Sequence, residues 1–127
     1  MLKQTITYTD YSEVERTETF LFNLSQAEVA EMELSTSGGL TSLIQRIIDE
    51  KDQTKLVELF KSIILKAYGE KSPDGKFFRK LDDDGKPLSR NFAQTEAYSD
   101  LFMKLVTDAD AASAFMKGII PEAPKQK

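Results

Sequence analysis

Carboxylates are almost the only side chains in this sequence that could carry out catalysis or bind a metal. The 127 residues contain no His and no Cys, which excludes His-assisted nucleophilic catalysis and Cys/His zinc sites. The sequence also lacks the GxGxxG and GxxxxGK[ST] patterns that bind nucleotide phosphates. Three acidic runs remain: IDEKD at 48–52, DDD at 82–84 and DAD at 108–110. An enzyme built from this chain would therefore use carboxylates in acid–base or metal chemistry.

The DDDG run resembles a calcium-binding loop but breaks its pattern. If Gly85 held the sixth place, Lys80 would take the first and Asn91 the twelfth. A calcium loop needs a carboxylate at the first place and a bidentate Glu at the last. We interpret DDDG as a solvated turn, with a weak cation contact as the alternative. The other two runs fall at the expected end of one helix and start of another, so we predict no catalytic residue, cofactor or metal.

Two adjacent aromatic residues stand out in the most polar part of the chain. Phe77 and Phe78 are flanked by Lys76, Arg79 and Lys80. One interpretation is that one or both rings fold back onto the core. The other is that they form an exposed anchor for a protein partner, since aromatic residues with nearby Arg often dominate binding energy. Phe77 and Phe78 are therefore the candidate partner-binding residues.

The N-terminal segment has the alternating pattern of a β-hairpin. In LKQTITY (2–8), Leu2, Ile6 and Tyr8 share one face, and TETFLFN (17–23) repeats the alternation. Period-two patterns rich in Thr, Ile and aromatic residues predict strands. A two-stranded hairpin is marginal alone, so its apolar face must pack on helices.

Local capping signals predict where the first helix begins. Ser25 suits the N-cap, and Glu28 completes a capping box with it. Leu24 and Val29 occupy the positions of a hydrophobic staple on either side of the cap. We expect the helix to end within STSGG, 35–39, where two glycines can leave the helical conformation.

Apolar periodicity predicts further helices over 40–50 and 56–68, with Gly69 as the C′ residue of the second. A polar interval then spans 70–91. SPDG predicts a type I turn and DDGK a second turn. The residues between these turns fit either a short hairpin or an irregular loop.

The C-terminal third predicts two more helices. The first spans 92–106, with Asn91 as a possible N-cap. The second begins near Thr107 or Asp108 and is stopped by Gly118 and Pro121.

Together these elements predict a single α+β domain, mainly α-helical, with the N-terminal β-hairpin packed on about four to five helices. We expect the domain to cover 1–120 and a flexible C-terminal tail to cover 121–127. The predicted core residues are Ile6, Tyr8, Phe20, Phe22, Val29, Leu43, Ile47, Phe60, Ile64, Tyr98, Leu101, Phe102 and Phe115.

The overall charge argues against nucleic-acid binding. The net charge is −4, whereas nucleic-acid binders need a basic face. Residues 36–81 are mildly basic, which we interpret as solvated helix faces, with contact to an anionic surface as the alternative. No apolar run approaches the roughly 20 residues that span a bilayer, and MLKQTITYTD has no signal-peptide h-region. We therefore expect a cytoplasmic protein that does not interact with membranes.

The segment FAQTEAYSDLFMKLVTDADAASAFMKGIIP, which begins at Phe92, resembles the C-terminal signature of a family of phage tail assembly chaperones. This family occurs in tailed phages and prophages with long non-contractile tails. The N-terminal half and LKAYGEKSPDGKFF (65–78) are also similar to the family, so the resemblance covers about 1–120. LDDDGKPLS and the final EAPKQK are the least family-like parts.

The resemblance implies a protein that is not an enzyme. Members of the family are thought to coat the tape measure protein, a long helical chain, and to keep it soluble while tail tube subunits polymerise around it. They are then absent from the mature virion. The resemblance also implies that a longer frameshift product recruits the tail tube protein, that this chain is the short product, and that it acts in the bacterial host cytoplasm. The alternative is a structural tail component retained in the virion. Self-association is compatible with either.

Overall fold

The two predicted N-terminal strands pair as a hairpin. The computed structural model describes residues 1–35, 45, 49 and 53–120. Strand β1 (Leu2–Thr9) pairs antiparallel with β2 (Glu15–Phe22) along its whole length. Both strands therefore lie where the alternating pattern predicted them.

The two faces of this hairpin have different chemistry. On the outer face, Thr5 bonds Thr19 and Thr7 bonds Thr17 through their hydroxyl oxygens, at 2.9 and 3.0 Å. On the inner face, Tyr8 and Phe22 are buried. The alternation of side chains along a strand thus separates a solvated threonine face from a core face.

Two further strands extend the sheet in the order β1-β2-β3-β4, with antiparallel pairs throughout. They are β3 (Tyr68–Lys71) and β4 (Phe78–Arg79). The residues between the two predicted turns contain β4, which pairs with β3 across the first turn. This arrangement is a short hairpin, one of the two alternatives that the sequence left open.

The prediction of Gly69 as a C′ residue gives its position correctly, because the preceding helix ends at Ala67, but not its conformation. Gly69 lies within β3, opposite Leu21, and has no positive φ. A Cβ atom at this position would lie 2.5 Å from Cε2 of Phe78. Glycine is required here because the Phe78 ring packs directly against the backbone.

The first helix, α1 (Gln26–Ser35), begins with the predicted capping box. The Glu28 backbone N–H donates to Ser25 Oγ at 3.1 Å, and the Ser25 N–H donates to Glu28 Oε1 at 2.9 Å. The predicted end of this helix within 35–39 falls on residues that, after Ser35, lie outside the described part of the chain. The predicted helix over 40–50 lies outside the described residues, except for residues 45 and 49.

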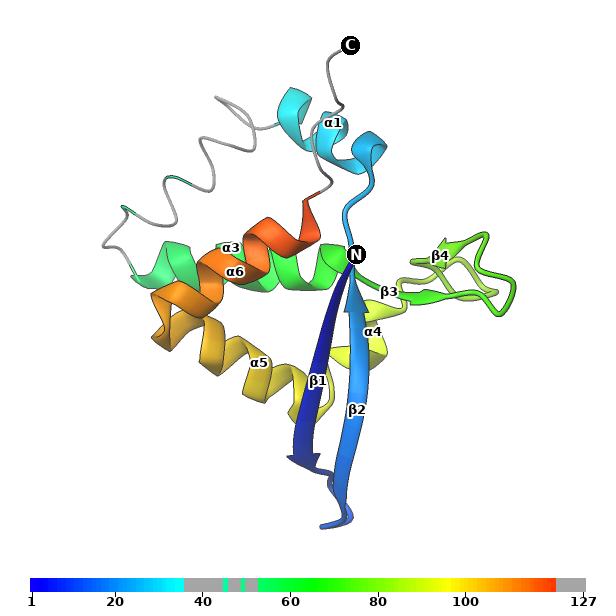
Figure 1. Cartoon of the computed structure of the whole chain (residues 1–127), viewed down its shortest axis with the longest axis vertical. Helices are drawn as coiled ribbons and strands as arrows, with labels where there is room; N and C mark the ends of the chain where they lie inside the picture. Colours follow the sequence, from blue (N-terminus) through cyan, green and yellow to red (C-terminus); the bar gives the residue numbers. More distant parts are fainter. Residues whose placement is uncertain (36–44, 46–48, 50–52, 121–127) are drawn as a thin grey trace.

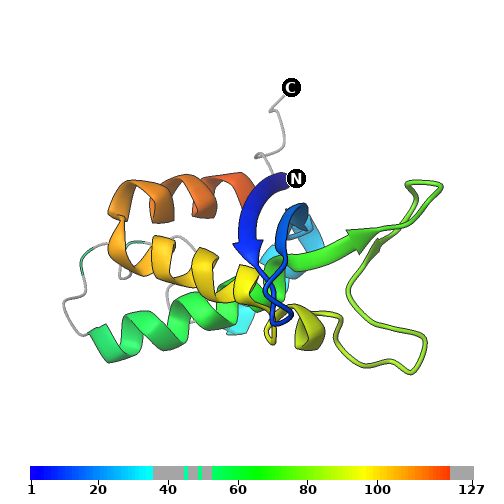
Figure 2. The ribbon, with the colours of Figure 1, turned by 90° about the horizontal axis from the view of Figure 1, so that it is seen from below.

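Three longer helices lie beside the N-terminal hairpin: α3 (Gln53–Ala67), α5 (Glu96–Thr107) and α6 (Ala109–Ile119). Figure 2 shows them in a row, with α5 between α3 and α6. Strand β1 contacts both α5 and α6. Within the described part of the chain, no helix is long and apolar enough to cross a membrane.

One predicted helix boundary in this region is wrong. Asn91 lies inside a short helix, α4 (Ser89–Phe92), and α5 is instead capped by Thr95, whose hydroxyl accepts from the Tyr98 N–H. The end of α6 at Ile119 falls between Gly118 and Pro121, the two residues predicted to stop it. A Cβ on Gly118 would lie 2.7 Å from Leu2 Cδ1, so this glycine allows β1 to approach the helix. The prediction of Asp108 as a cap for α6 is confirmed.

An aromatic cluster joins the sheet to the helices. The ring of Phe22 meets Tyr68, Phe92 and Phe115 edge-on, with centroids 5.9, 5.7 and 5.3 Å away. Tyr68 stacks on Phe92 at 4.5 Å. These contacts connect β2, β3, α4 and α6, which are far apart in the sequence.

The predicted core is largely correct. Six of the predicted residues are buried: Tyr8, Phe22, Phe60, Ile64, Leu101 and Phe115. Five more are partly buried against the core: Ile6, Phe20, Val29, Tyr98 and Phe102. Leu43 and Ile47 lie outside the described residues. The prediction missed Leu24, Ile63, Ala67, Phe92, Ala97, Leu105, Ala112, Met116 and Ile119.

Replacement of Phe by Ala at three positions that differ in burial tests the assignment of this core. We expect Phe22→Ala to reduce the free energy of unfolding by about 3–5 kcal/mol, because it empties a fully buried site. Phe102→Ala should cost less, because Phe102 is only partly buried. Phe77→Ala should change stability by about 0.5 kcal/mol or less, because the ring is exposed. Urea unfolding measures all three, and a larger loss at Phe102 than at Phe22 would contradict the assignment of the core.

Candidate protein-binding arm

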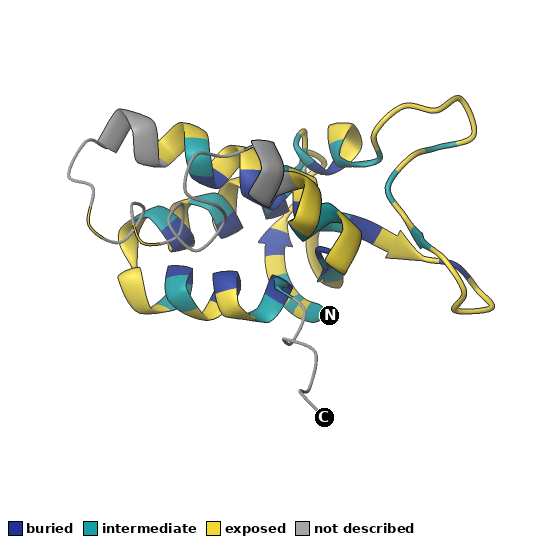
Figure 3. Ribbon diagram, turned by 90° about the horizontal axis from the view of Figure 1, so that it is seen from above, coloured by how far each residue is buried: buried dark blue, intermediate teal, exposed yellow. Residues whose placement is uncertain are grey.

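Residues 68–88 form an arm that projects from the body of the molecule (Figures 1 and 2). The arm contains β3, β4 and the two predicted turns. Figure 3 shows that most of its surface is exposed, whereas the helices bury the faces they turn toward one another. Tyr68 fixes the root of the arm by stacking on Phe92. Burial, with the nearby Glu70 charge, raises the pKa of Tyr68 to about 12, so its hydroxyl stays protonated at neutral pH.

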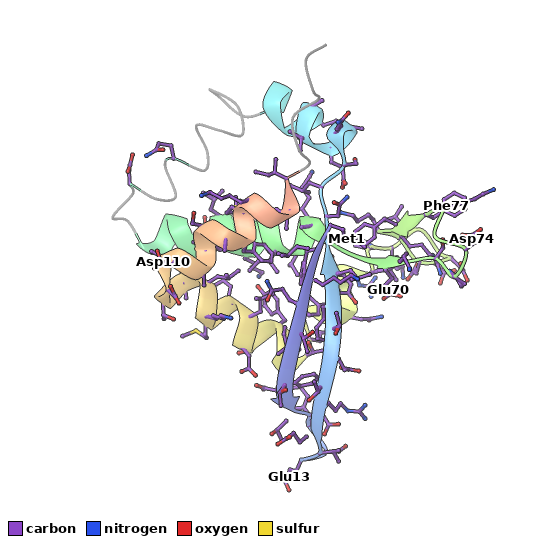
Figure 4. All side chains as sticks on the ribbon, in the orientation of Figure 1. Met1, Glu13, Glu70, Asp74, Phe77 and Asp110 are labelled. Carbon is purple, nitrogen blue, oxygen red and sulfur yellow. The ribbon has the colours of Figure 1, made fainter. Side chains whose placement is uncertain are left out.

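The arm places alternate side chains on opposite sides. Phe78 packs on Gly69, and Lys80 reaches into the body. Phe77 and Leu81 are instead 63% and 52% exposed. Period-two alternation along an extended chain accounts for this separation. Of the two candidate residues from the sequence, Phe77 is therefore exposed at the surface (Figure 4), whereas Phe78 is partly buried.

The turn that carries Phe77 is held by a hydrogen-bond network around Ser72, which is only 7% exposed. The Ser72 hydroxyl accepts from the Phe77 N–H at 3.0 Å and donates to Asp74 Oδ1 at 2.7 Å. The Lys76 N–H also donates to Asp74 Oδ1, at 3.0 Å. These bonds lower the pKa of Asp74, with the Ser72 hydroxyl making the largest contribution. The network fixes the backbone from which Phe77 projects.

The acidic DDDG run forms the second turn of the arm. Asp82 Oδ1 accepts from the backbone N–H groups of Asp84 and Lys86, both at 2.9 Å. Leu81 and Pro87 form an antiparallel bridge at the base of this turn. Asp82 thus has a structural role in the turn, and among the described residues no group of three acidic side chains is placed to hold a metal ion.

Lys80 ties the arm to the body of the protein. Its Nζ donates to the carbonyl oxygens of Asn23 and Lys66, at 2.9 and 2.6 Å, and lies 3.2 Å from Glu28 Oε2. Burial lowers the pKa of Lys80 against the opposing effect of Glu28. For Glu28, burial raises the pKa, but hydrogen bonds from Ser25 and the charge of Lys80 give a net lowering. This role could not be predicted from the sequence, because the partners of Lys80 are distant in the chain.

Replacing Lys80 tests whether it anchors the arm. We expect Lys80→Met to reduce the free energy of unfolding by about 1–3 kcal/mol, because two carbonyls and one carboxylate lose a charged donor. Lys76→Met, on the exposed side of the same arm, is the matched control and should change stability by about 0.5 kcal/mol or less. Equal effects of the two substitutions, measured by urea unfolding, would contradict the anchoring role.

The pH dependence of the Phe77 turn follows from Asp74. Because the folded state lowers the pKa of Asp74, its contribution to stability is present above the unfolded value of about 3.9 and is lost as the pH falls through the folded value. An NMR titration of the Lys76 amide shift should therefore have a midpoint below about 3.9. In Asp74→Asn, which keeps an acceptor oxygen but cannot titrate, this transition should disappear. A wild-type midpoint at or above the ordinary value would show that the network does not stabilise the carboxylate.

Comparison with known proteins identifies the family of the chain. A family model described as phage tail assembly chaperone matches residues 1–127, the whole sequence. No curated protein and no solved structure matches the chain. The family match agrees with the resemblance that begins at Phe92. The chain therefore belongs to the phage tail assembly chaperone family.

Proposed function

We propose that this chaperone binds the tape measure protein, keeps it soluble and promotes polymerisation of the tail tube around it. The match of the family model to the whole chain is the observation that carries this proposal. We further propose that the protein acts in the host cytoplasm without catalytic activity and is absent from the mature virion. A longer frameshift product would recruit the tail tube protein.

We propose the arm as the contact with this client, through Phe77 and the exposed part of Phe78. Support comes from the exposure of the Phe77 ring and from the hydrogen bonds that fix its turn. A rigid aromatic anchor loses little conformational entropy on binding. A single anchor of this size is also weak. Weak contacts repeated along a long client give firm overall binding but can be displaced one at a time, as tube assembly requires.

Co-expression with the tape measure protein tests the proposal. We expect the client to become soluble and to co-purify with this protein. Phe77→Ser should reduce the co-purified fraction severalfold. Met103→Ser, which removes an exposed apolar side chain from α5, is the control and should have no effect. A client that is equally insoluble with and without the chaperone would refute the function. Unchanged binding by Phe77→Ser would refute only the assignment of the arm.

The alternative is a structural tail component that stays in the particle. Mass spectrometry of purified virions distinguishes the two. The chaperone proposal predicts near absence of this chain, whereas a structural component would be present in a fixed ratio to the tube protein.

A further inference from the structure

The first helix, α1, is attached to the body of the molecule mainly through its first turn. Figure 1 shows α1 apart from α3 and α6. Among the described elements, α1 shares no extensive contact with another helix or strand. Of its described side chains, residues 26–31, only Glu28 and Val29 are partly buried. The position of α1 therefore depends on a few contacts near its start.

The residues that lead into α1 are fixed to the ends of two other helices. The Asn23 N–H donates to the Ala67 carbonyl at the end of α3, at 2.8 Å. The Leu24 N–H donates to the Ile119 carbonyl at the end of α6, at 2.9 Å, and the Leu24 side chain is buried. The chain thus enters α1 from a fixed point, so any change in the direction of α1 must begin after Leu24.

Lys80 connects this point to the arm. An ammonium group has three N–H donors, and each donor of Lys80 has an acceptor within reach. The carbonyl oxygens of Asn23 and Lys66 take two, and the carboxylate of Glu28 takes the third. The two carbonyls belong to the body of the protein. Glu28 is therefore the acceptor that α1 supplies, and it is the charged one of the three.

The charge of Glu28 offsets the cost of placing Lys80 in a partly buried site. The side chains of Lys80 and Glu28 are 25% and 26% exposed. Burial, the largest effect, and the nearby charge of Lys66 lower the pKa of Lys80, whereas Glu28 opposes them. Removing one partner of such a pair leaves the charge of the other without compensation. Each of the two side chains therefore holds the other in its site.

The outer strand of the arm depends on the same contact. Strand β3 is joined to β2 at the root of the arm, through the pairs Leu21–Gly69 and Phe22–Tyr68. Strand β4 is the outermost of the described strands and pairs with β3. Lys80 follows directly after β4, and its hydrogen bonds fasten this side of the arm to the body. Loss of these bonds would therefore loosen the outer side of the arm first.

We propose that Glu28 and Lys80 form a latch that couples α1 to the arm. When α1 moves away from the body, Lys80 loses its counter-charge and the arm loosens. When the arm moves, Glu28 loses its cation and α1 loosens. The coupling is reciprocal, because both elements share the free energy of one contact. In a consequence that rests on the function proposed above, α1 would control how firmly the arm presents Phe77 to the client.

Two substitutions open the latch from opposite sides. Glu28→Gln keeps an oxygen for the Ser25 N–H in the capping box but removes the charge that faces Lys80. Lys80→Met removes the cation. Glu31→Gln is the matched control, because Glu31 is exposed on α1 and forms no salt bridge with another described residue. The test uses the isolated chain without a client, so its outcome is separate from that of the co-expression experiment.

Pulsed electron paramagnetic resonance on spin-labelled pairs measures the two movements. The chain has no Cys, so cysteines introduced at exposed positions are labelled specifically. Thr9→Cys on the hairpin is the common reference. It is paired with Lys76→Cys to report on the arm and with Ala30→Cys to report on α1. Circular dichroism melting checks that every variant is folded.

The latch predicts effects that cross from one element to the other. We expect Glu28→Gln to raise the share of displaced arm conformers at least about fivefold, and Lys80→Met to do the same for α1, the lower end of ordinary coupling. The control should leave both distance distributions as in the parent chain. An arm distribution that Glu28→Gln does not change, or an α1 distribution that Lys80→Met does not change, would overturn the inference.

Discussion

The packing of Phe22 is the contact on which the rest of the structure depends. Its ring is fully buried at the end of β2 and meets aromatic rings from β3, α4 and α6. Because these elements come from separate parts of the sequence, the cluster holds the hairpin, the root of the arm and the C-terminal helix in one arrangement. Edge-to-face aromatic pairs add specificity to the free energy of burial. The cluster thus acts together with the β2–β3 pairing and the Lys80 contacts to fix the arm relative to the hairpin.

The arm is rigid because polar contacts hold it at three points. Lys80 fixes its inner side to Asn23, Lys66 and Glu28, and the Ser72 network and the Asp82 turn fix its outer end. Hydrogen bonds in partly buried sites are costly to leave unmade, so these segments are ordered despite their polar sequence. The result is a fixed presentation of Phe77 and Leu81, which suits recognition of another protein surface.

Family membership and the surface chemistry support the same kind of activity. Membership of the family implies binding to other tail proteins. The exposed Phe77 side chain, on its ordered turn, would provide a contact that is weak by itself and strong when repeated along a long client.

The sequence alone determined the features that depend on local interactions. Alternation defined the hairpin, the Ser25–Glu28 pair placed the start of α1, Asp108 capped α6, and the apolar periodicity identified much of the core. The sequence also singled out Phe77 and Phe78, but could not say which was exposed. Only the tertiary structure decided this, because the close approach of Phe78 to Gly69 and the contacts of Lys80 join residues distant in the chain. Gly69 and Gly118 lie near the helix ends that the sequence predicted, but a packing neighbour, absent from the local sequence, is what requires each glycine.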